Sequence, residues 1–372
     1  MKLSVMQENL ARGLAVVGRA VSSRPTLPVL ANVLLRTQDG GLKLTATNLE
    51  IGITCWVPGK IETDGAITVP ARLFADLVGS LPGSERVDLT VEAPDTLGLR
   101  CGRVATHIRG IDADEFPAIQ AAGDRPTTRI AQGTLRRALT ETIFAAATDE
   151  ARPILTGVLW HFDGDRLTLA AADNYRIAVR TIPILDPVPD TSVVVPARSL
   201  TELGRVLADT DDPVDVVLAG ARNQILFHLE GVDLISRLID GQFPNYRQVL
   251  PTSHTTAAIV ERDELLRTLR PAGFIAGTAA NIVKLVVGGP ADGEVKVTAA
   301  AEVGDYEGGV GATIDGDPTT IAFNVRYLTD VLTNVEAERF AIELNGPLSP
   351  GVFRPVGDDA YIHVVMPVRT TS

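Results

Sequence analysis

Apolar residues near the start of the chain recur with a helical period. Leu10, Leu14, Val17 and Val21 are separated by four, three and four positions. Residues three and four apart lie on one face of an α-helix, so this spacing predicts an amphipathic helix over residues 8–22 with one buried face.

The following segments change to a pattern that is typical of strands. Residues 29–36, 41–47 and 49–56 are rich in Leu, Val, Ile and Thr, which favour extended backbone. Asp39-Gly40-Gly41 separates the first two segments and is a hairpin signal. A second helix is expected after Pro70, because proline fits the first turn of a helix.

This order of elements occurs three times. The sequence Val-Pro-Ala-Arg at 69–72 recurs at 195–198, and Phe-Asn-Val-Arg at 323–326 is a looser copy, so the three arginines are 126 and 128 positions apart. A second marker has the same period, with copies at 42–46, 167–171 and 295–299. Two markers with one period predict three repeats of about 124 residues.

Each repeat reads as helix, strands, helix, strands. We therefore expect an α+β fold in which two helices pack on β-sheet in every repeat. The predicted domains are 1–122, 128–252 and 255–372. The helices expected in the second and third repeats cover 132–148, 197–209, 261–272 and 324–335.

The charge of the chain is acidic overall but its cations are unusual. The formal net charge is −12, and 29 of the 34 basic residues are arginines. At about 100° per residue, Arg12 and Arg19 lie opposite the apolar face of the first helix, and Arg198 and Arg205 are placed in the same way on the fourth. Ordinary solvated helix surfaces would explain this pattern. The alternative is a shared basic surface that faces a phosphate backbone, and the repetition of the arginines in phase adds support to that alternative.

Motifs for catalysis are missing from the sequence. It has no P-loop, nucleophile elbow, zinc-protease motif or dinucleotide-binding fingerprint, and its five histidines are scattered singly. Acidic loops at 112–115 and 209–212 leave one alternative open, an α+β enzyme with catalytic carboxylates in these loops.

The chain has only two cysteines, Cys55 and Cys101. Its first residues lack the apolar core of a signal peptide, and no run approaches the roughly 18 apolar residues of a membrane-spanning helix. These features predict a cytoplasmic protein in a reducing environment, without membrane association.

Five motifs then occur in a fixed order along the chain. They are Arg-Pro-Thr-Leu-Pro-Val-Leu at 24–30, the two Val-Pro-Ala-Arg helix starts, Ile-Asp-Gly-Gln-Phe-Pro-Asn-Tyr-Arg at 239–247, and Val-Met-Pro-Val-Arg at 365–369. Together with the triple repeat, they closely resemble the bacterial DNA polymerase III beta subunit family, the replicative sliding clamps. The resemblance covers essentially the whole chain.

The resemblance implies a fold and a function. Each subunit would have three similar DNA-clamp domains, and a homodimer would close head to tail into a ring around double-stranded DNA without reading its sequence. The subunit would be non-catalytic, would need no cofactor, and would tether the DNA polymerase III alpha subunit for processive synthesis. The clamp loader, other polymerases and repair proteins would dock through short apolar peptide motifs. A duplicate clamp kept for repair or drug resistance is the alternative within the family.

The resemblance also implies three sets of site residues. DNA contacts are expected from Arg24, Arg72, Arg136, Arg137, Arg198 and Arg205. The dimer interface is expected to include Thr106 and Ile108 on one side, and Phe274 and Ile275 on the other. The peptide pocket is expected to comprise Leu155, Ala172, Asn174, Tyr175, Arg176, Ile177, Pro244, Gln248, Val249, Pro350, Val364, Val365, Met366, Pro367, Val368 and Arg369.

Some of these residues have simpler interpretations, and some depart from the family pattern. Arg24 could be a turn residue before Pro25, and Ile177 could be plain core, whereas residues 364–368 are expected to be exposed apolar groups at the chain end. The family more often has Gly-His at 174–175 and a basic residue at 248. It also commonly ends one residue after Arg369, where this chain adds three, so the preferred partner motif stays open.

Overall fold

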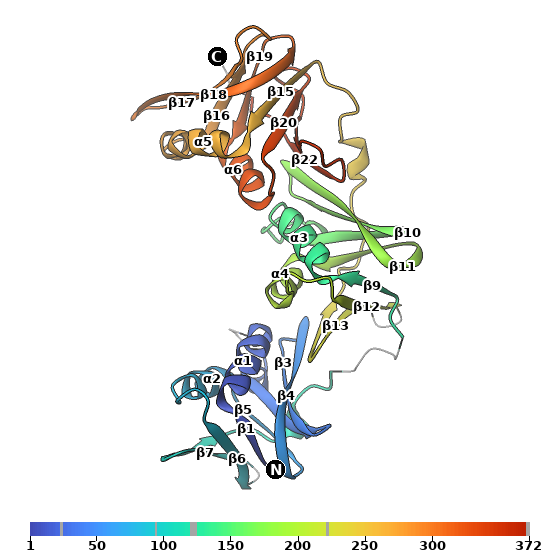
Figure 1. Ribbon diagram of the computed structural model, residues 1–372, viewed down its shortest axis with the longest axis vertical. Helices are drawn as coiled ribbons and strands as arrows, with labels where there is room; N and C mark the ends of the chain where they lie inside the picture. The colour runs from blue at the N-terminus through green and yellow to red at the C-terminus, as the bar shows by residue number, and fades with distance from the viewer. Residues whose placement is uncertain (23–24, 94, 120–124, 221–222, 370–372) are drawn as a thin grey trace. The chain divides into compact units, whose positions relative to one another are not determined.

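The computed structural model describes residues 1–22, 25–93, 95–119, 125–220 and 223–369. The chain forms two compact units (Figure 1). Unit 1 contains residues 1–132 and 210–238, and unit 2 contains residues 133–209 and 239–372. The second sequence repeat therefore contributes to both units, which its sequence does not indicate.

Unit 1 carries the first pair of helices. α1 (Gln7–Val17) and α2 (Ala71–Gly79) lie side by side. The buried side chains of α1 include Leu10, Leu14 and Val17, as their spacing predicts. The expected helix is too long, however, because a 3₁₀ turn begins at Gly18 and leaves Val21 half-buried outside the helix. Glycine has a low helix propensity, which favours this early end.

The strands of unit 1 form a sheet with the order β8-β7-β6-β1-β4-β14-β13-β12-β9, and β5, β2 and β3 form a branch beside β4. Their bounds are β1 Lys2–Met6, β2 Asn32–Gln38, β3 Gly41–Thr47, β4 Ile51–Thr63, β5 Ala66–Pro70, β6 Arg86–Ala93, β7 Thr96–Cys101, β8 Val104–Arg109, β9 Thr128–Ala131, β12 Pro213–Ala219, β13 Gln224–Leu229 and β14 Val232–Arg237.

The predicted hairpin at the start of unit 1 is confirmed. β2 and β3 pair through Gln38 and Gly41, and the two turn residues Asp39 and Gly40 have φ of 51° and 77°. Two positive φ values are typical of a tight type I′ turn, which matches the twist of paired strands. The strand expected from residue 29 begins instead at Asn32, because Pro28 starts a short 3₁₀ turn.

Unit 2 contains the other two helix pairs and a second sheet with the order β10-β11-β22-β21-β20-β15-β18-β17-β16-β19. The helices are α3 Gln132–Ile143, α4 Ala197–Val206, α5 Arg262–Gly277 and α6 Val325–Asn334. The strands are β10 Gly157–Ala172, β11 Arg176–Pro196, β15 Thr256–Glu261, β16 Ile282–Val287, β17 Glu294–Ala301, β18 Gly304–Gly316, β19 Thr319–Asn324, β20 Arg339–Leu344, β21 Gly351–Pro355 and β22 Tyr361–Val365.

Two helices per repeat are therefore confirmed, with shifted ends. α5 continues to Gly277, past the expected end at residue 272 and past Pro271 inside the helix. Ala272 and Ala276, which follow Pro271 in α5, are buried, so tertiary packing outweighs the poor helix propensity of proline. None of the helices in the described ranges is long and apolar enough to cross a membrane.

Consecutive repeats are joined by one kind of strand pairing. In unit 1, β4 pairs antiparallel with β14, with Ile51 opposite Ser236. In unit 2, β11 pairs antiparallel with β22, with Arg176 opposite Val365. Ile51 and Arg176 are 125 positions apart, the same offset as the strand marker that precedes them, so they are equivalent positions in the first and second repeats. We call the β4–β14 pairing the first junction and the β11–β22 pairing the second junction.

Candidate functional site

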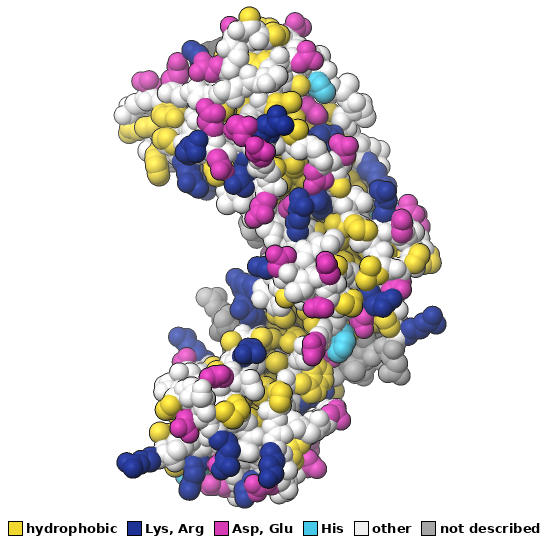
Figure 2. All heavy atoms as spheres, in the orientation of Figure 1, with side chains coloured by type: hydrophobic (Ala, Val, Ile, Leu, Met, Phe, Trp, Pro, Cys, Tyr) yellow, Lys and Arg dark blue, Asp and Glu magenta, His cyan; other side chains and the backbone are white. Residues whose placement is uncertain are grey.

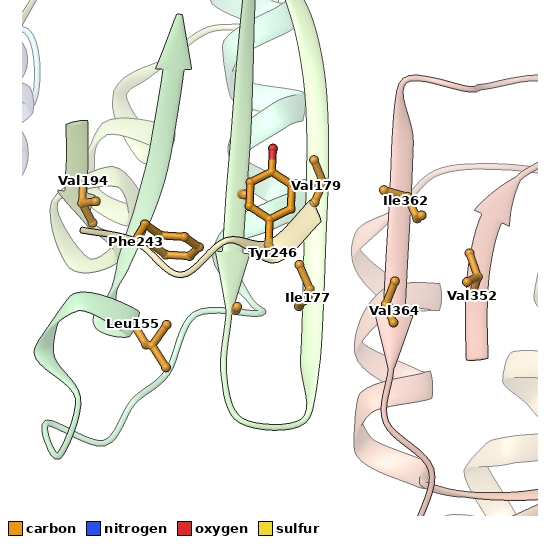
Figure 3. Packing of buried hydrophobic residues seen from close by; sticks show 11 residues of the cluster. Leu155, Ile177, Val179, Val194, Phe243, Tyr246, Val352, Ile362 and Val364 are labelled. Atoms are coloured by element: carbon orange, nitrogen blue, oxygen red, sulfur yellow. The ribbon is translucent and has the colours of Figure 1, made fainter. Parts of the chain in front are cut away.

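The sheet at the second junction has two different faces, because side chains alternate along each strand. On one face Ile177 and Val179 of β11 lie beside Ile362 and Val364 of β22 (Figure 3). These belong to an apolar cluster of buried side chains that β21 and the segment 243–246 also contribute to. Its members are Leu155, Ala170, Ala172, Ile177, Val179, Val194, Phe243, Tyr246, Val352, Ile362 and Val364.

Most residues expected in the peptide pocket lie in or beside this apolar cluster. Leu155, Ala172, Ile177 and Val364 are members of it, and Val249 packs against it. The half-buried residues of the expected set are Arg176, Val249, Pro350, Met366, Pro367 and Val368, and the exposed ones are Asn174, Tyr175, Pro244, Gln248 and Arg369. The predicted set therefore contains buried residues, which would form the floor of the expected pocket, and exposed residues, which would form its rim.

The expectation of exposed apolar residues at the chain end is wrong for two of them. Val364 and Val365 are 1% and 0% exposed, because they lie in β22 between β11 and β21. Val365 follows Val364 in the strand and so points to the opposite face of the sheet. Met366 to Val368 are half-buried. Thr370 to Ser372, expected to shade the pocket, lie outside the described residues.

Tyr175 is an exposed residue of the expected set, with 57% of its surface accessible. Its carbonyl oxygen accepts a hydrogen bond of 2.8 Å from the Met366 backbone N–H. Its ring stacks on Tyr327 of α6 with centroids 6.3 Å apart. Beside it, the Asn174 side-chain oxygen accepts a hydrogen bond of 3.1 Å from Arg152. Sequence reasoning missed Arg152 and Tyr327, since nothing local places α6 beside the turn at 173–175.

On the opposite face of the sheet, the Arg176 guanidinium is fully engaged. It donates to Asp173 at 3.0 Å, to Asp330 of α6 at 2.5 Å and to the Phe144 carbonyl at 2.6 Å. The Tyr327 ring centroid lies 4.6 Å from its central carbon, a cation–π contact. Arg176 therefore ties the turn at 173–175 to α6.

Four residues later on β11, Arg180 belongs to a buried network of charges. Its Nε lies 3.2 Å from Glu141 Oε2 of α3, and its Nη1 lies 2.6 Å from Asp358 Oδ2 in the turn before β22. Arg137 completes the network, at 2.8 Å from Glu141 and 3.2 Å from Asp358. We call Arg137, Glu141, Arg180 and Asp358 the four-charge network. Two cations face two carboxylates, so the network is neutral.

Burial acts differently on the two carboxyl groups of this network. Burial raises the pKa of Glu141 above its usual value, and the hydrogen bond from Arg137 and the charge of Arg180 only partly oppose this effect. Burial also raises the pKa of Asp358, but the hydrogen bond and charge of Arg180 outweigh it and leave that pKa below its usual value. The ion pair of Arg180 with Asp358 is therefore the better compensated contact.

His363 of β22 is also completely buried on this face. Its ring centroid lies 5.4 Å from that of Phe144, and neither ring nitrogen has a hydrogen-bond partner among the described residues. Burial, aided by the charge of Arg176, lowers the pKa of His363 to about 3. The imidazole is therefore neutral at ordinary pH and packs as part of the core.

The arginines expected to contact DNA differ in how free they are. Arg72, Arg136 and Arg198 are exposed on α2, α3 and α4. Arg205 is exposed but pairs with Glu202 at 2.8 Å, and Arg137 belongs to the four-charge network. Arg24 lies outside the described residues. Figure 2 shows basic and acidic side chains interspersed on the visible face.

The residues expected at a dimer interface lie on two elements. Thr106 and Ile108 are on β8, where Thr106 is half-buried and Ile108 is only 4% exposed. Phe274 and Ile275 are on α5, and Phe274 is 79% exposed. A large exposed aromatic side chain is typical of a protein contact.

The acidic loop at 112–115 has a local structural role. Asp112 accepts a hydrogen bond of 2.9 Å from the Asp114 backbone N–H and so starts a short 3₁₀ turn. Within the described ranges, no group of three or more His, Cys, Asp or Glu side chains is placed to hold a metal ion.

Comparison with known families matches the chain in three consecutive parts. The DNA polymerase III beta subunit models match with their N-terminal domain at residues 1–120, their central domain at 129–245 and their C-terminal domain at 247–369. The beta sliding clamp of Synechococcus elongatus is 36% identical over 377 residues, and that of Bacillus subtilis is 31% identical over 381 residues. Each alignment covers 100% of both chains.

Solved structures agree with this match. The crystal structure of the DNA polymerase sliding clamp from Bacillus subtilis aligns with a TM-score of 0.95 at 30% identity, and covers 100% of both chains. A sliding clamp from Pseudomonas aeruginosa bound to griselimycin aligns with a TM-score of 0.93 at 30% identity, also over 100% of both chains. The chain belongs to the DNA polymerase III beta subunit family, the bacterial sliding clamps.

Proposed function

We propose that two copies of this chain join head to tail into a ring around duplex DNA, and that the pocket over the apolar cluster binds partner peptides. As a member of its family, the chain is a non-catalytic sliding clamp, a processivity factor for DNA polymerase III that binds DNA and forms a dimer.

The strand edges carry the proposal for the dimer. Both junctions contain the same backbone hydrogen bond, from Arg237 N–H to the Glu50 carbonyl at 2.9 Å and from Met366 N–H to the Tyr175 carbonyl at 2.8 Å. β8 is the strand of the first repeat that corresponds to β14 and β22, since each closes the same hairpin of its repeat. In the described residues β8 pairs only with β7, and residues 304–311 of β18 pair only with β17.

These two free edges are complementary. The start of β18 corresponds to the starts of β4 and β11, because Gly304 lies 128 positions after Arg176. A third junction between two copies would therefore place Ile108 opposite Gly304 and Thr106 opposite Tyr306. An interface that joins different edges is head to tail, and it closes when its rotation allows two copies to form a ring. Exposed Phe274 on α5, which packs against β18, would be covered by this contact.

The helix arginines support sequence-independent DNA binding. Arg72 and Arg198 are exposed at equivalent positions of α2 and α4, and Arg136 is exposed on α3. Contacts with phosphate fix a protein on DNA without reading bases, and a few exposed arginines leave such contacts weak enough to slide. We assign Arg205 and Arg24 to the same surface by the resemblance of the sequence. Arg137 contributes less, because it is held in the four-charge network.

The pocket suits short peptides with apolar anchors. Its floor is the apolar cluster, and its rim holds Tyr175, Gln248, Met366 and Arg369. Methionine side chains adapt to several ligands, which suits a surface shared by a polymerase, a clamp loader and repair proteins. Such ligands would place a few apolar side chains against the floor and concentrate their binding energy there.

The remaining assignments concern organisation and compartment. We place the domains at 1–122, 128–252 and 255–372, which is supported by the sequence period and by family matches of similar extent. We also assign the protein to the cytoplasm, which is supported by two buried free thiols, Cys55 and Cys101.

The ring can be tested by its dependence on DNA ends. The dimer, loaded on nicked circular DNA, should stay bound in a salt wash and should dissociate after the DNA is cut once with a restriction enzyme. The reason is that only a topological link depends on free ends. Equal retention on circular and linear DNA would contradict the proposed function.

A further inference from the structure

The second junction carries charges that strand pairing does not require. Arg176 and Arg180 correspond to Ile51 and Cys55 at the first junction, each 125 positions earlier. Ile51 and Cys55 are apolar and only 3% and 8% exposed. The same pairing of strands therefore forms with an apolar core, so the two arginines are not needed for the pairing itself.

The second junction is also where the proposed peptide pocket lies. The floor combines Ile177 and Val179 from the second repeat with Ile362 and Val364 from the third. A peptide that contacts both strands would lose contacts if β22 moved relative to β11. Pocket shape therefore depends on how firmly the third repeat is held to the second.

The four-charge network connects these two repeats from the far face of the sheet. Glu141 on α3 and Arg180 on β11 belong to the second repeat, whereas Asp358 lies in the turn that leads into β22. In the contact between the repeats, the Arg180 side chain is 9% exposed and that of Asp358 is 24% exposed, so solvent screens this ion pair only in part. A guanidinium can hold two carboxylates at once in a fixed geometry, which a lysine ammonium cannot.

We propose that Arg180 is a positioning residue for peptide binding. It holds Asp358, and with it β22, against β11, and so fixes the two halves of the pocket floor without touching the peptide. This inference rests on the proposed peptide pocket. It predicts that peptide affinity depends on a contact on the opposite face of the sheet.

Asp358→Asn tests this inference, because it removes one charge from the contact between repeats while Arg180 keeps Glu141. Glu202→Gln is a matched control: Glu202 is 15% exposed and pairs with Arg205, but both residues lie within α4. Titration of full-length dimer with a fluorescent peptide of the Gln-Leu-x-Leu-Phe type should give a Kd about five- to tenfold higher for Asp358→Asn. Glu202→Gln should stay within twofold of the unmodified protein.

Hydrogen exchange separates positioning from a general loss of stability. Amides of β22 (Tyr361–Val365) should exchange faster in Asp358→Asn, while those of β20 (Arg339–Leu344), in the same sheet, should not. Arg180→Met should raise the Kd further, and Arg180→Lys should recover only part of the loss. An unchanged Kd in folded Asp358→Asn and Arg180→Met dimers would overturn the inference. Failure of the unmodified protein to bind the peptide would instead contradict the proposed pocket.

Discussion

The two junctions between repeats share their backbone and differ in their side chains. At the first junction, where β4 pairs with β14, Ile51 and Cys55 of β4 are buried. At the second junction, the equivalent positions of β11 are occupied by Arg176 and Arg180. Both keep the same register and the same backbone hydrogen bond. The repeat therefore fixes how strands join, and side chains at individual positions decide what each junction does.

This difference has an energetic meaning. Apolar burial holds two strands together without a preferred partner, whereas a buried ion pair is costly unless every charge is compensated. The second junction has its ion pairs on one face of the sheet and the apolar cluster on the other. Replacing these charges should therefore alter the second junction and leave the first junction unchanged.

The largest effect is expected at the third junction, the proposed contact between two copies. Phe274→Asp should convert the dimer to monomer at micromolar concentration, since it places a charge in a buried contact. Phe274 is 79% exposed within one chain, so the variant should fold normally. Leu185→Asp, at a residue 56% exposed in β11, is the control and should remain dimeric. Sedimentation velocity measures both, and a dimeric Phe274→Asp would remove Phe274 from the interface.

The next effect concerns the buried charges of the second junction. Arg180→Met should lower the free energy of unfolding by about 3 kcal/mol, because it leaves buried Glu141 with Arg137 as its one remaining cation of the network. Combining it with Glu141→Met should recover most of that loss, since the junction then resembles the apolar first one. Peptide affinity should stay reduced in the double variant. Urea unfolding measures stability, and a double variant no more stable than Arg180→Met would contradict this description.

A pH-dependent effect, smaller than the previous one within the first pH unit below 6.5, is expected from His363. Its pKa is about 3 in the folded protein, against a usual value of 6.5, so below pH 6.5 the unfolded chain binds a proton that the folded protein excludes. Stability should therefore fall as the pH drops from 6.5 towards 3, by up to about 1.4 kcal/mol per pH unit from this group. His363→Leu should remove this part of the slope. Urea midpoints measured at several pH values for both proteins would show it, and parallel slopes would refute it.

The smallest effect separates two neighbouring arginines of α3. Arg136 is exposed, whereas Arg137 contacts Glu141 and Asp358. Arg136→Ala should weaken DNA binding about two- to threefold and reduce its salt dependence. Arg137→Ala should instead lower the melting temperature more than it lowers DNA affinity. Fluorescence anisotropy at two salt concentrations, with thermal melting of the same samples, distinguishes the two arginines. Equal losses of DNA affinity would place both on the DNA surface.

The sequence predicts what repeats and periodicity determine. The three-fold repeat, the helix pairs and the 39–40 hairpin follow from local spacing, and α4 buries Leu200 and Leu203 with Arg198 and Arg205 exposed. The ends of the helices do not follow from local spacing. Gly18 ends α1 before the apolar pattern ends, and packing extends α5 past Pro271, which is a poor helix former.

The site is only partly predictable for the same reason. The resemblance to the family selects the residues of the pocket, but it cannot tell that Val364 and Val365 are buried in a strand. The partners of Arg180 lie 39 positions before it and 178 after it in the chain. No spacing rule joins such distant residues, so the four-charge network is visible only in the folded protein.

One cross-linking measurement tests the central claim, that a shared strand pairing joins the repeats within a chain and the chains to each other. Thr106→Cys combined with Tyr306→Cys should place two thiols on directly opposite strand positions of the proposed third junction. By the register of the first junction these positions form a non-hydrogen-bonded pair, whose Cβ atoms are close enough for a disulfide. Both native cysteines are buried and should not compete. Mild oxidation should give a covalent dimer that resists dissociation, whereas the shifted pair of Thr106→Cys with Gly308→Cys should not. Failure of the first pair to cross-link, or equal cross-linking of the shifted pair, would contradict the account.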